Sequence, residues 1–291
     1  MSRIRPKIKQ DVLPLPLRML CFVIIILTVI IMGLPMLNVL SVSLSDSASS
    51  DSPGLLLLPV GVTTEGFSFI WKNSKLYRPF FNTVFVSVTG TLLHILLSSL
   101  GGYVLCQQSL PFRKSLTTFV LLTMAVPSEL TLIGIYAVNK DLGLINTYTG
   151  LIINGMVSGF SVFMMRNYFS SIPRSLSESA RIDGASEILI FLNIYMRLAS
   201  AGLITIGTLE LIRRWNNITM TITLISDMKL WTLPVVLKFI LFNPDSTSGT
   251  TYIFSNAKMA AVVISAAPLV IIYFMAQRFL VGGVLLGAVR E

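Results

Sequence analysis

Four polar side chains share one face of an apolar segment and are the strongest candidates for chemistry in this sequence. Glu210, Arg213, Arg214 and Asn217 follow at helical spacing within the stretch 201–225. Glu210 can pair with either arginine on the same helix, which leaves the cluster with a net charge of +1. An arginine fork suits a carboxylate or a sulfate, and the asparagine amides and Trp215 suit a sugar. The face therefore predicts either the lining of a path for a polar solute or a Glu–Arg pair that holds helices together.

Two further apolar segments carry single polar groups. Glu129 interrupts the stretch 116–138, and Asn154 lies in the stretch 142–165. Ionisable groups inside a membrane are costly and usually face the bundle interior or an aqueous path. His94 stands alone on an apolar segment and is expected to pack or to hydrogen-bond between helices, and Gly155-x-x-x-Gly159 is expected to allow close helix packing. The candidate pathway residues are Glu129, Asn154, Glu210, Arg213, Arg214 and Asn217.

Several kinds of active site are missing from the sequence. It has no G-x-x-x-x-G-K-[ST] loop for ATP, no H-E-x-x-H and no G-x-S-x-G. The single histidine cannot build most metal sites, and the two cysteines lie in apolar runs without CxxC spacing. We therefore expect neither an enzyme, nor a metal site, nor a cofactor held by this chain.

The composition identifies the elements that must position these residues. Hydrophobic residues make up 54% of the chain and charged residues 12%, half the share usual in soluble domains, so a soluble enzyme is excluded. A bilayer-spanning helix needs about 20 apolar residues. Six stretches qualify, and they predict an all-α polytopic membrane protein with one transmembrane domain over residues 1–291: 19–45, 79–112, 116–138, 142–165, 201–225 and 259–277.

The distribution of Lys and Arg predicts the orientation of these spans. Of the 22 Lys and Arg, 13 fall in the N-terminal tail, the 107–115 loop, the 166–200 segment and the C-terminal tail, against 7 in the opposite loops. Cytoplasmic loops carry the excess of Lys and Arg, so both termini are expected in the cytoplasm. The net charge of +9 is then an orientation signal, and nucleic-acid binding is discarded.

The cytoplasmic loop 170–195 differs from the others. Ser175 and Glu178 have the S-x-x-E spacing of a capping box, which predicts a helix start. Gly184 can take the left-handed conformation that ends a helix, and Ser186 can cap the next one. The loop therefore predicts a short, solvated helix, a sharp turn and a second helix, an arrangement suited to docking into a groove of another protein.

This loop resembles the EAA loop of ABC-importer permeases, in which E-A-A is followed at fixed spacing by G and later by I-x-L-P. Glu178-Ser179-Ala180 stands for E-A-A, and Gly184 has the expected spacing. The string from Ala180 through Asp183 to Ala185 is typical of the carbohydrate-uptake, maltose-type branch. Trp215-Asn216 resembles a Trp-Asn pair common in the fifth span of this branch, and the long 243–257 loop is closer to the subgroup that handles complex oligo- and polysaccharides. Ser179 and the missing Pro, where Ile194-Tyr195-Met196-Arg197 stands, depart from the pattern.

The resemblance implies a six-helix type I importer domain that does not itself hydrolyse ATP. It implies a second, homologous permease as heterodimer partner, two ATPase subunits that hold ATP and Mg, an extracytoplasmic sugar-binding protein and a bacterial cytoplasmic membrane. It assigns ATPase coupling to Glu178, Ser179, Ala180, Asp183 and Gly184. The substrate is expected to be an oligo- or polysaccharide, and the fifth-segment arginines admit an acidic one, such as a uronate oligomer.

One alternative of another class stays open. A secondary transporter or channel for a small polar solute would need no ATPase and would couple protons or ions through Glu129 and Glu210.

Overall fold

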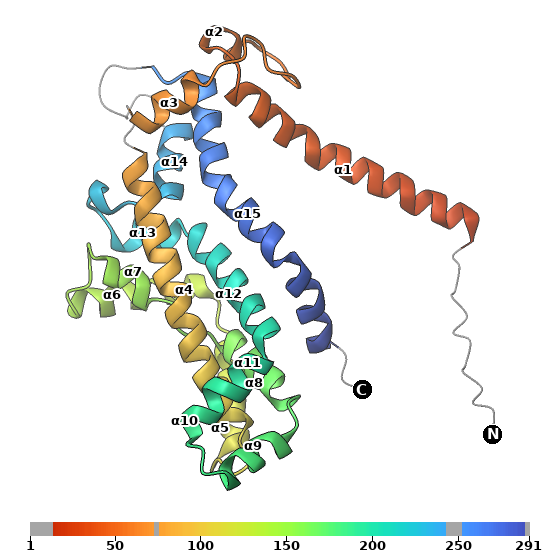
Figure 1. Cartoon of the computed structure of the whole chain (residues 1–291). Coiled ribbons are helices and arrows are strands. Elements are labelled where there is room, and N and C mark those ends of the chain that lie inside the picture. Colours follow the sequence, from red (N-terminus) through yellow and green to blue (C-terminus); the bar gives the residue numbers. More distant parts are fainter. Residues whose placement is uncertain (1–13, 73–75, 243–251, 289–291) are drawn as a thin grey trace. The chain divides into compact units, whose positions relative to one another are not determined.

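A computed structural model describes residues 14–72, 76–242 and 252–288, and the regular elements within these ranges are all helices (Figure 1). Four of the five basic residues of the N-terminal tail (Arg3, Arg5, Lys7 and Lys9) and Arg290 lie outside the described residues, as does most of the 243–257 loop, whereas Arg18 lies within the first helix. The chain divides into two units, Met1–Phe67 with Phe254–Ala260 and Ser68–Ile253 with Ala261–Glu291, which are described separately.

The first unit consists of a long apolar helix and a small folded segment beyond it. Helix α1 (Leu15–Ser43) is long and apolar enough to cross a membrane, and its most apolar window is not buried by protein at all. Asp46 accepts a hydrogen bond from Ser49 N (2.7 Å) and so caps the short helix α2 (Ser47–Ser50). The buried Asn256 amide donates to Ser45 O (3.1 Å), which fixes the start of this segment.

Helix α4 (Tyr77–Cys106) is the centre of the second unit, which also contains most of α3 (Glu65–Lys72). It packs against α8 (Gly159–Ser170) and α12 (Ser200–Trp215). A Cβ on Gly102 would lie 2.8 Å from Arg166 N, so this glycine is required where α4 and α8 cross. The adjacent pair Gly101-Gly102 is a sequence pattern that predicts such a tight crossing, and the structure confirms it.

The third and fourth predicted spans are each interrupted instead of being single helices. The third is divided into α5 (Arg113–Thr123) and α6 (Ser128–Asp141), with Pro127 as the N-cap of α6. The fourth is divided into α7 (Tyr148–Ile153) and α8, with Ser158 as the N-cap of α8. Among the described residues, three helices are each long and apolar enough to cross a membrane, namely α1, α4 and Ser255–Phe279 of α15 (Ser255–Ala288). The expectation of one continuous helix per apolar stretch is therefore wrong for the third and fourth. It is also wrong for the fifth (201–225), because α12 ends at Trp215 and the next helix begins at Thr219, which places Asn217 beyond the end of α12.

The fifth span is approached through a sharp bend. The chain runs through α9 (Arg174–Ile182), α10 (Glu187–Ile190), a π-helix (Phe191–Tyr195) and α11 (Met196–Leu198). The segments Glu187–Leu198 and Ser200–Trp215 meet at 79°, and together they qualify as a fourth, broken span. Three short helices follow: α13 (Thr219–Leu224), a 3-10 turn (Met228–Leu230) and α14 (Leu233–Phe242).

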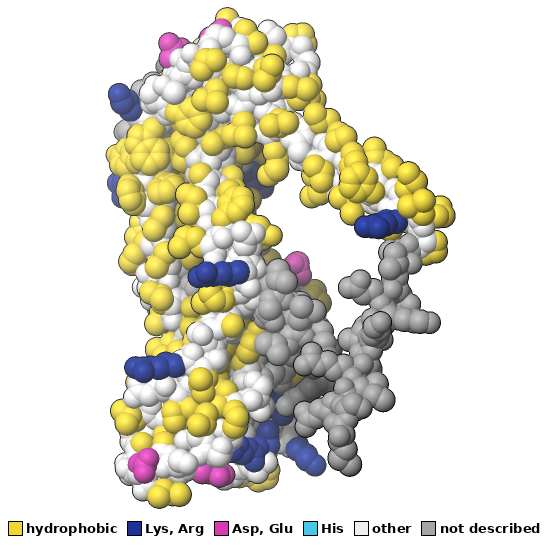
Figure 2. Space-filling model, turned by 45° about the vertical axis from the view of Figure 1, so that its right-hand side comes forward, with side chains coloured by type: hydrophobic (Ala, Val, Ile, Leu, Met, Phe, Trp, Pro, Cys, Tyr) yellow, Lys and Arg dark blue, Asp and Glu magenta, His cyan; other side chains and the backbone are white. Residues whose placement is uncertain are grey.

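Apolar side chains dominate the outer surface of these helices. Figure 2 shows hydrophobic groups over much of the visible face, with Lys, Arg, Asp and Glu in isolated positions. Exposed large apolar residues lie on α1, α4 and the membrane-crossing part of α15. Such a surface fits a lipid environment rather than water.

Candidate functional site

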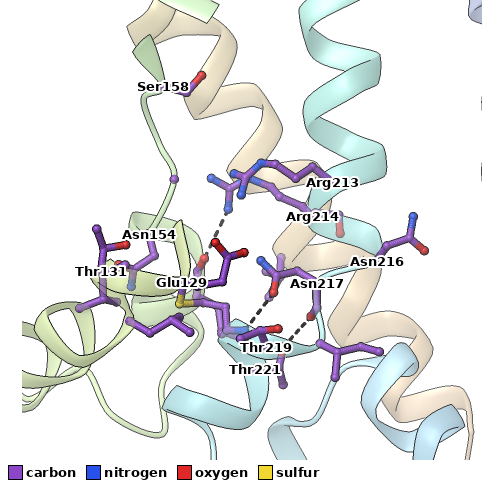
Figure 3. A pocket seen from close by; sticks show the side chains of 18 of the residues that line it. Glu129, Thr131, Asn154, Ser158, Arg213, Arg214, Asn216, Asn217, Thr219 and Thr221 are labelled. Atoms are coloured by element: carbon purple, nitrogen blue, oxygen red, sulfur yellow. Dashed lines mark hydrogen bonds between the residues drawn. The ribbon is translucent and has the colours of Figure 1, made fainter. Parts of the chain in front are cut away.

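The interrupted spans enclose a cavity of about 940 Å³ in the second unit (Figure 3). Its walls come from α4, α6, the break between α7 and α8, the end of α12, and α13. Five of the six predicted pathway residues line it: Glu129, Asn154, Arg213, Arg214 and Asn217. The sixth, Glu210, is absent from the lining and is buried, with a side chain that is 4% exposed.

Glu210 binds both arginines of the predicted cluster. Its carboxylate accepts hydrogen bonds from Arg213 Nε (2.7 Å) and Nη2 (2.6 Å) and from Arg214 Nε (2.6 Å). The Arg213 side chain is 50% exposed, whereas that of Arg214 is 4% exposed. The two arginines therefore differ in what they can do, because only Arg213 presents its guanidinium group to the cavity solvent.

Arg214 satisfies the end of a helix. Its Nη1 donates to Leu151 O and Ile152 O, both at 3.3 Å, near the C-terminus of α7. A helix leaves its last carbonyl groups unpaired, and a cation there is stabilising. Arg214 thus holds the fourth span at the residue where its helix is interrupted.

His94 on α4 holds the other side of the same break. Its Nδ1 lies 2.8 Å from Gly155 O and therefore donates to it, and its Nε2 lies 2.7 Å from Ser161 Oγ. The ring is fully buried, and Nδ1 is also 3.6 Å from Glu210 Oε1. The hydrogen-bonding role expected for His94 is confirmed, with an unwound segment as one partner.

Gly155 does not serve as half of a helix-packing motif. Its φ is +81°, and it lies between α7 and α8, so the GxxxG expectation is wrong for this residue. Gly159 does allow close packing, since a Cβ there would lie 2.6 Å from Val120 O on α5.

The two asparagines of the predicted pathway have their amides engaged within the protein. Asn154 Nδ2 donates to Gly150 O (2.6 Å) and to Asn139 Oδ1 (3.1 Å), which ties α7 to α6. Asn217 Oδ1 accepts from Met220 N (2.9 Å) at the start of α13. Both line the cavity, yet their hydrogen bonds serve mainly to shape its wall.

The cavity also contains hydroxyl groups that the sequence interpretation missed. Ser87, Thr131, Ser158, Thr221 and Thr232 line it, and Ser87 Oγ is buried without a hydrogen-bond partner among the described residues. Hydroxyls at four-residue spacing on α4 (Thr83, Ser87, Thr91) were the available signal. It is weak, because Ser and Thr in helices commonly bond to their own backbone.

The loop 170–195 forms a second candidate site. Helix α9 begins with Pro173 as its N-cap and without a side-chain cap, so the predicted Ser175–Glu178 capping box is wrong. Gly184 has a φ of +81°, as predicted, and Ser186 Oγ accepts from Leu189 N (3.4 Å), which confirms the second cap. The helix–turn–helix is therefore present.

Helix α9 and the turn after it present most of the predicted coupling residues to solvent. Glu178, Ser179, Asp183 and Gly184 are exposed, whereas Ala180 packs against the aromatic core. Ile182 is 87% exposed, an unusual position for a large apolar side chain. The exposed face therefore combines a carboxylate, small residues and an apolar side chain.

The last turn of α9 is tied to the helix bundle through Glu187. Arg181 Nε donates to Glu187 Oε1 (2.6 Å), and the Tyr103 hydroxyl donates to Glu187 Oε2 (2.5 Å). The bond to Glu187 raises the pKa of Arg181 above its usual value, so the guanidinium stays charged. Tyr103 stacks edge-on with Tyr195 and packs near Phe169. Movement of α9 is thereby linked to α4.

Comparison with known proteins identifies one family. The sequence model of the family described as binding-protein-dependent transport system inner membrane component matches residues 94–285 of this chain. A polygalacturonan/rhamnogalacturonan transport system permease protein of Bacillus subtilis is 29% identical over 280 residues, covering 94% of this chain and 97% of that protein. An arabinooligosaccharides transport system permease protein of Halalkalibacterium halodurans is 29% identical over 259 residues, with coverages of 88% and 90%.

A solved structure shares the fold. A chain from a bacterial ABC transporter involved in the import of the acidic polysaccharide alginate superposes with a TM-score of 0.80 at 24% identity, covering 90% of this chain and 95% of that chain.

Proposed function

Because the chain belongs to the family of binding-protein-dependent transport system inner membrane components, we propose that it is the permease subunit of an ABC importer that moves oligo- or polysaccharides inward across a bacterial cytoplasmic membrane. The observation that carries the proposal is the polar cavity at the interrupted third and fourth spans. Irregular backbone at membrane depth is tolerated where it is buried in protein or lines a water-filled cavity. Relatives named for polygalacturonan and arabinooligosaccharides support the saccharide class.

The proposed assembly contains more than this chain. A second, homologous permease completes the passage, two ATPase subunits bind ATP and Mg, and an extracytoplasmic binding protein delivers the saccharide. This chain is proposed to be non-catalytic and to have both termini in the cytoplasm. The exposed face of α9, with Glu178 and Ile182, is proposed to dock into a groove of one ATPase subunit.

Transport then follows from two conformations of the assembly. Closure of the ATPase dimer carries α9 with its groove, and α9 pulls on the bundle through the Arg181–Glu187–Tyr103 contacts. ATP drives the change because it binds only one state of the ATPase pair tightly. The cavity opens to the binding protein in that state and to the cytoplasm after hydrolysis.

An acidic saccharide is a second candidate, favoured by the exposure of Arg213 into the cavity. The fifth-span cluster has a net charge of +1, but Glu129 lines the same cavity and brings the local balance to zero. A neutral saccharide is therefore equally compatible with the charge count. The relatives divide in the same way, since polygalacturonan is acidic and arabinooligosaccharides are neutral.

The test uses the complex purified with its ATPase and placed in proteoliposomes. We expect ATP-dependent uptake of arabinotriose or trigalacturonate, with ATP hydrolysis stimulated by the saccharide-loaded binding protein. Uptake that needs no ATPase and is abolished by a proton ionophore would establish the secondary-transporter alternative. In that case Glu129→Gln or Glu210→Gln would remove coupling, whereas an ABC importer keeps its ATP dependence in both variants.

A further inference from the structure

Gly155 lies where the cavity, the break in the fourth span and the fifth-span arginines meet. A Cβ built on Gly155 would lie 2.4 Å from Arg213 Nη2, far closer than real Cβ contacts. Gly143, in the turn after α6, also has a positive φ (+68°) but has no atom within 4 Å of its would-be Cβ. Both glycines have a positive φ, but of the two only Gly155 leaves space that a guanidinium group occupies.

Arg213 is held on its other side by Glu210. Nε and Nη2 both donate to that carboxylate, and among the described residues no further hydrogen bond is made by Nη1. The side chain is half exposed and lines the cavity. The guanidinium is therefore fixed in orientation by one carboxylate and one glycine, with its remaining edge available to a ligand.

Gly155 is itself fixed by a buried partner. Its carbonyl oxygen accepts from His94 Nδ1, and His94 is held by Ser161 in turn. Burial keeps the His94 ring in place, so the backbone that borders Arg213 is rigid. Because this backbone is rigid, a methyl group added at Gly155 must displace the guanidinium group of Arg213.

We propose that Arg213 is the specificity-determining residue of the translocation cavity, and that Gly155, Glu210 and His94 are positioning residues that set its guanidinium group. The inference rests on the proposed function. The saccharide meets Nη1 of Arg213, and Gly155 acts only through the space it leaves. Of the predicted pathway residues, Arg213 is thereby assigned the contact with the ligand, and Glu210 is assigned the placing of its guanidinium group.

A double-mutant cycle tests this assignment. Maximum ATP-driven uptake of arabinotriose and of trigalacturonate is measured with saturating binding protein for wild type, Gly155→Ala, Arg213→Ala and the double variant. Gly143→Ala, alone and with Arg213→Ala, is the matched control for positive-φ strain. Co-purification with the ATPase establishes that each variant assembles, and ATP hydrolysis stimulated by the loaded binding protein gives a second readout if uptake by Arg213→Ala is too low to measure.

We expect Gly155→Ala to lower uptake about tenfold when Arg213 is present and less than about twofold when it is Ala, since a misplaced group loses its contact. Gly143→Ala should change uptake less than about twofold in either background. The inference would be overturned if Gly155→Ala lowered uptake equally in both backgrounds, or if Gly143→Ala lowered uptake as much as Gly155→Ala does. Either result would leave the proposed importer function intact. A wild-type complex without ATP-driven uptake of either saccharide would contradict the proposed function itself.

Discussion

Arg214 donates from Nη1 to the carbonyl oxygen of Leu151 at 3.3 Å, which joins the end of α12 to the end of α7. The bond places a buried cation at a helix C-terminus, where the helix dipole favours it. Together with the Glu210 contact, it accounts for a charged side chain at a depth where an unpaired one is costly. Arg214 therefore has a structural role, whereas its neighbour Arg213 faces the cavity.

Arg214→Gln is therefore expected to damage assembly more than selectivity. Removing one partner of a buried ion pair typically costs about 3–5 kcal/mol, because the other charge is left uncompensated. The thermal stability of the purified complex should fall, and the yield with it. Arg213→Gln is the matched control, since its exposed side chain predicts a smaller stability loss and a larger uptake defect. Equal stability in the two variants would contradict the distinction.

Charge reversal on α9 should uncouple the ATPase from transport. Glu178 is exposed on the proposed docking face, so Glu178→Lys is expected to lower binding-protein-stimulated ATP hydrolysis at least about tenfold while the chain still inserts. Glu65→Lys, an exposed reversal on α3, is the control. Normal stimulation in Glu178→Lys would remove the support for this docking face.

Gly184→Leu should have a related effect through the backbone. The position has a φ of +81°, which costs an L-residue about 1–2 kcal/mol, and no atom lies within 4 Å of its would-be Cβ. The penalty is thus conformational and redirects α9 relative to α10. Gly184→Asn, which tolerates left-handed geometry better, should retain more ATPase stimulation than Gly184→Leu. The reverse order would show that side-chain bulk at the interface matters more than backbone angle.

Tyr103→Phe removes the hydroxyl that α4 offers to Glu187. A hydrogen bond to a charged group contributes about 1.5–3 kcal/mol, so the link between α9 and the bundle weakens while the aromatic packing stays. We expect ATP hydrolysis to continue with fewer saccharides moved per ATP. The ratio of uptake to hydrolysis in proteoliposomes measures this. An unchanged ratio would mean that the contact is dispensable for coupling.

The orientation is tested with single cysteines in a Cys21→Ser, Cys106→Ser background. Ser179 is exposed on α9, and Ser52 is exposed beyond α2. Ser179→Cys should react with a membrane-impermeant maleimide only after the membrane is opened, whereas Ser52→Cys should react once the outer envelope is permeable. Ser177 is unsuitable because it is buried. Labelling of Ser179→Cys from outside would reverse the orientation and exclude ATPase docking.

The sequence predicted those features that depend on local chemistry. Long apolar runs defined α1, α4 and α15, and the glycine at 184 marked a left-handed turn. The capping box failed because Pro173 starts α9 two residues before Ser175, a choice that the S-x-x-E spacing does not reveal.

The break between α7 and α8 could not be predicted from the sequence, for a different reason. Its free backbone groups are satisfied by His94 and Arg214, which are 61 and 63 positions away along the chain from Gly155 and Leu151. Only the folded arrangement shows that such partners exist. The uncharged apolar stretch 142–165 was therefore predicted to be one helix. The shape of the cavity depends on this break. The sequence therefore predicted several of the lining residues but not the shape of the cavity.

The bridge between Glu210 and its two arginines has a consequence for how the chain is made. Both ion pairs are formed within one helix, at spacings of three and four residues, so they can close before any other helix has packed. During synthesis, α12 can therefore enter the bilayer with two of its three charges already cancelled. The remaining positive charge is met when α12 packs against the terminal carbonyl groups of α7, so α12 can enter the membrane before the cavity has formed.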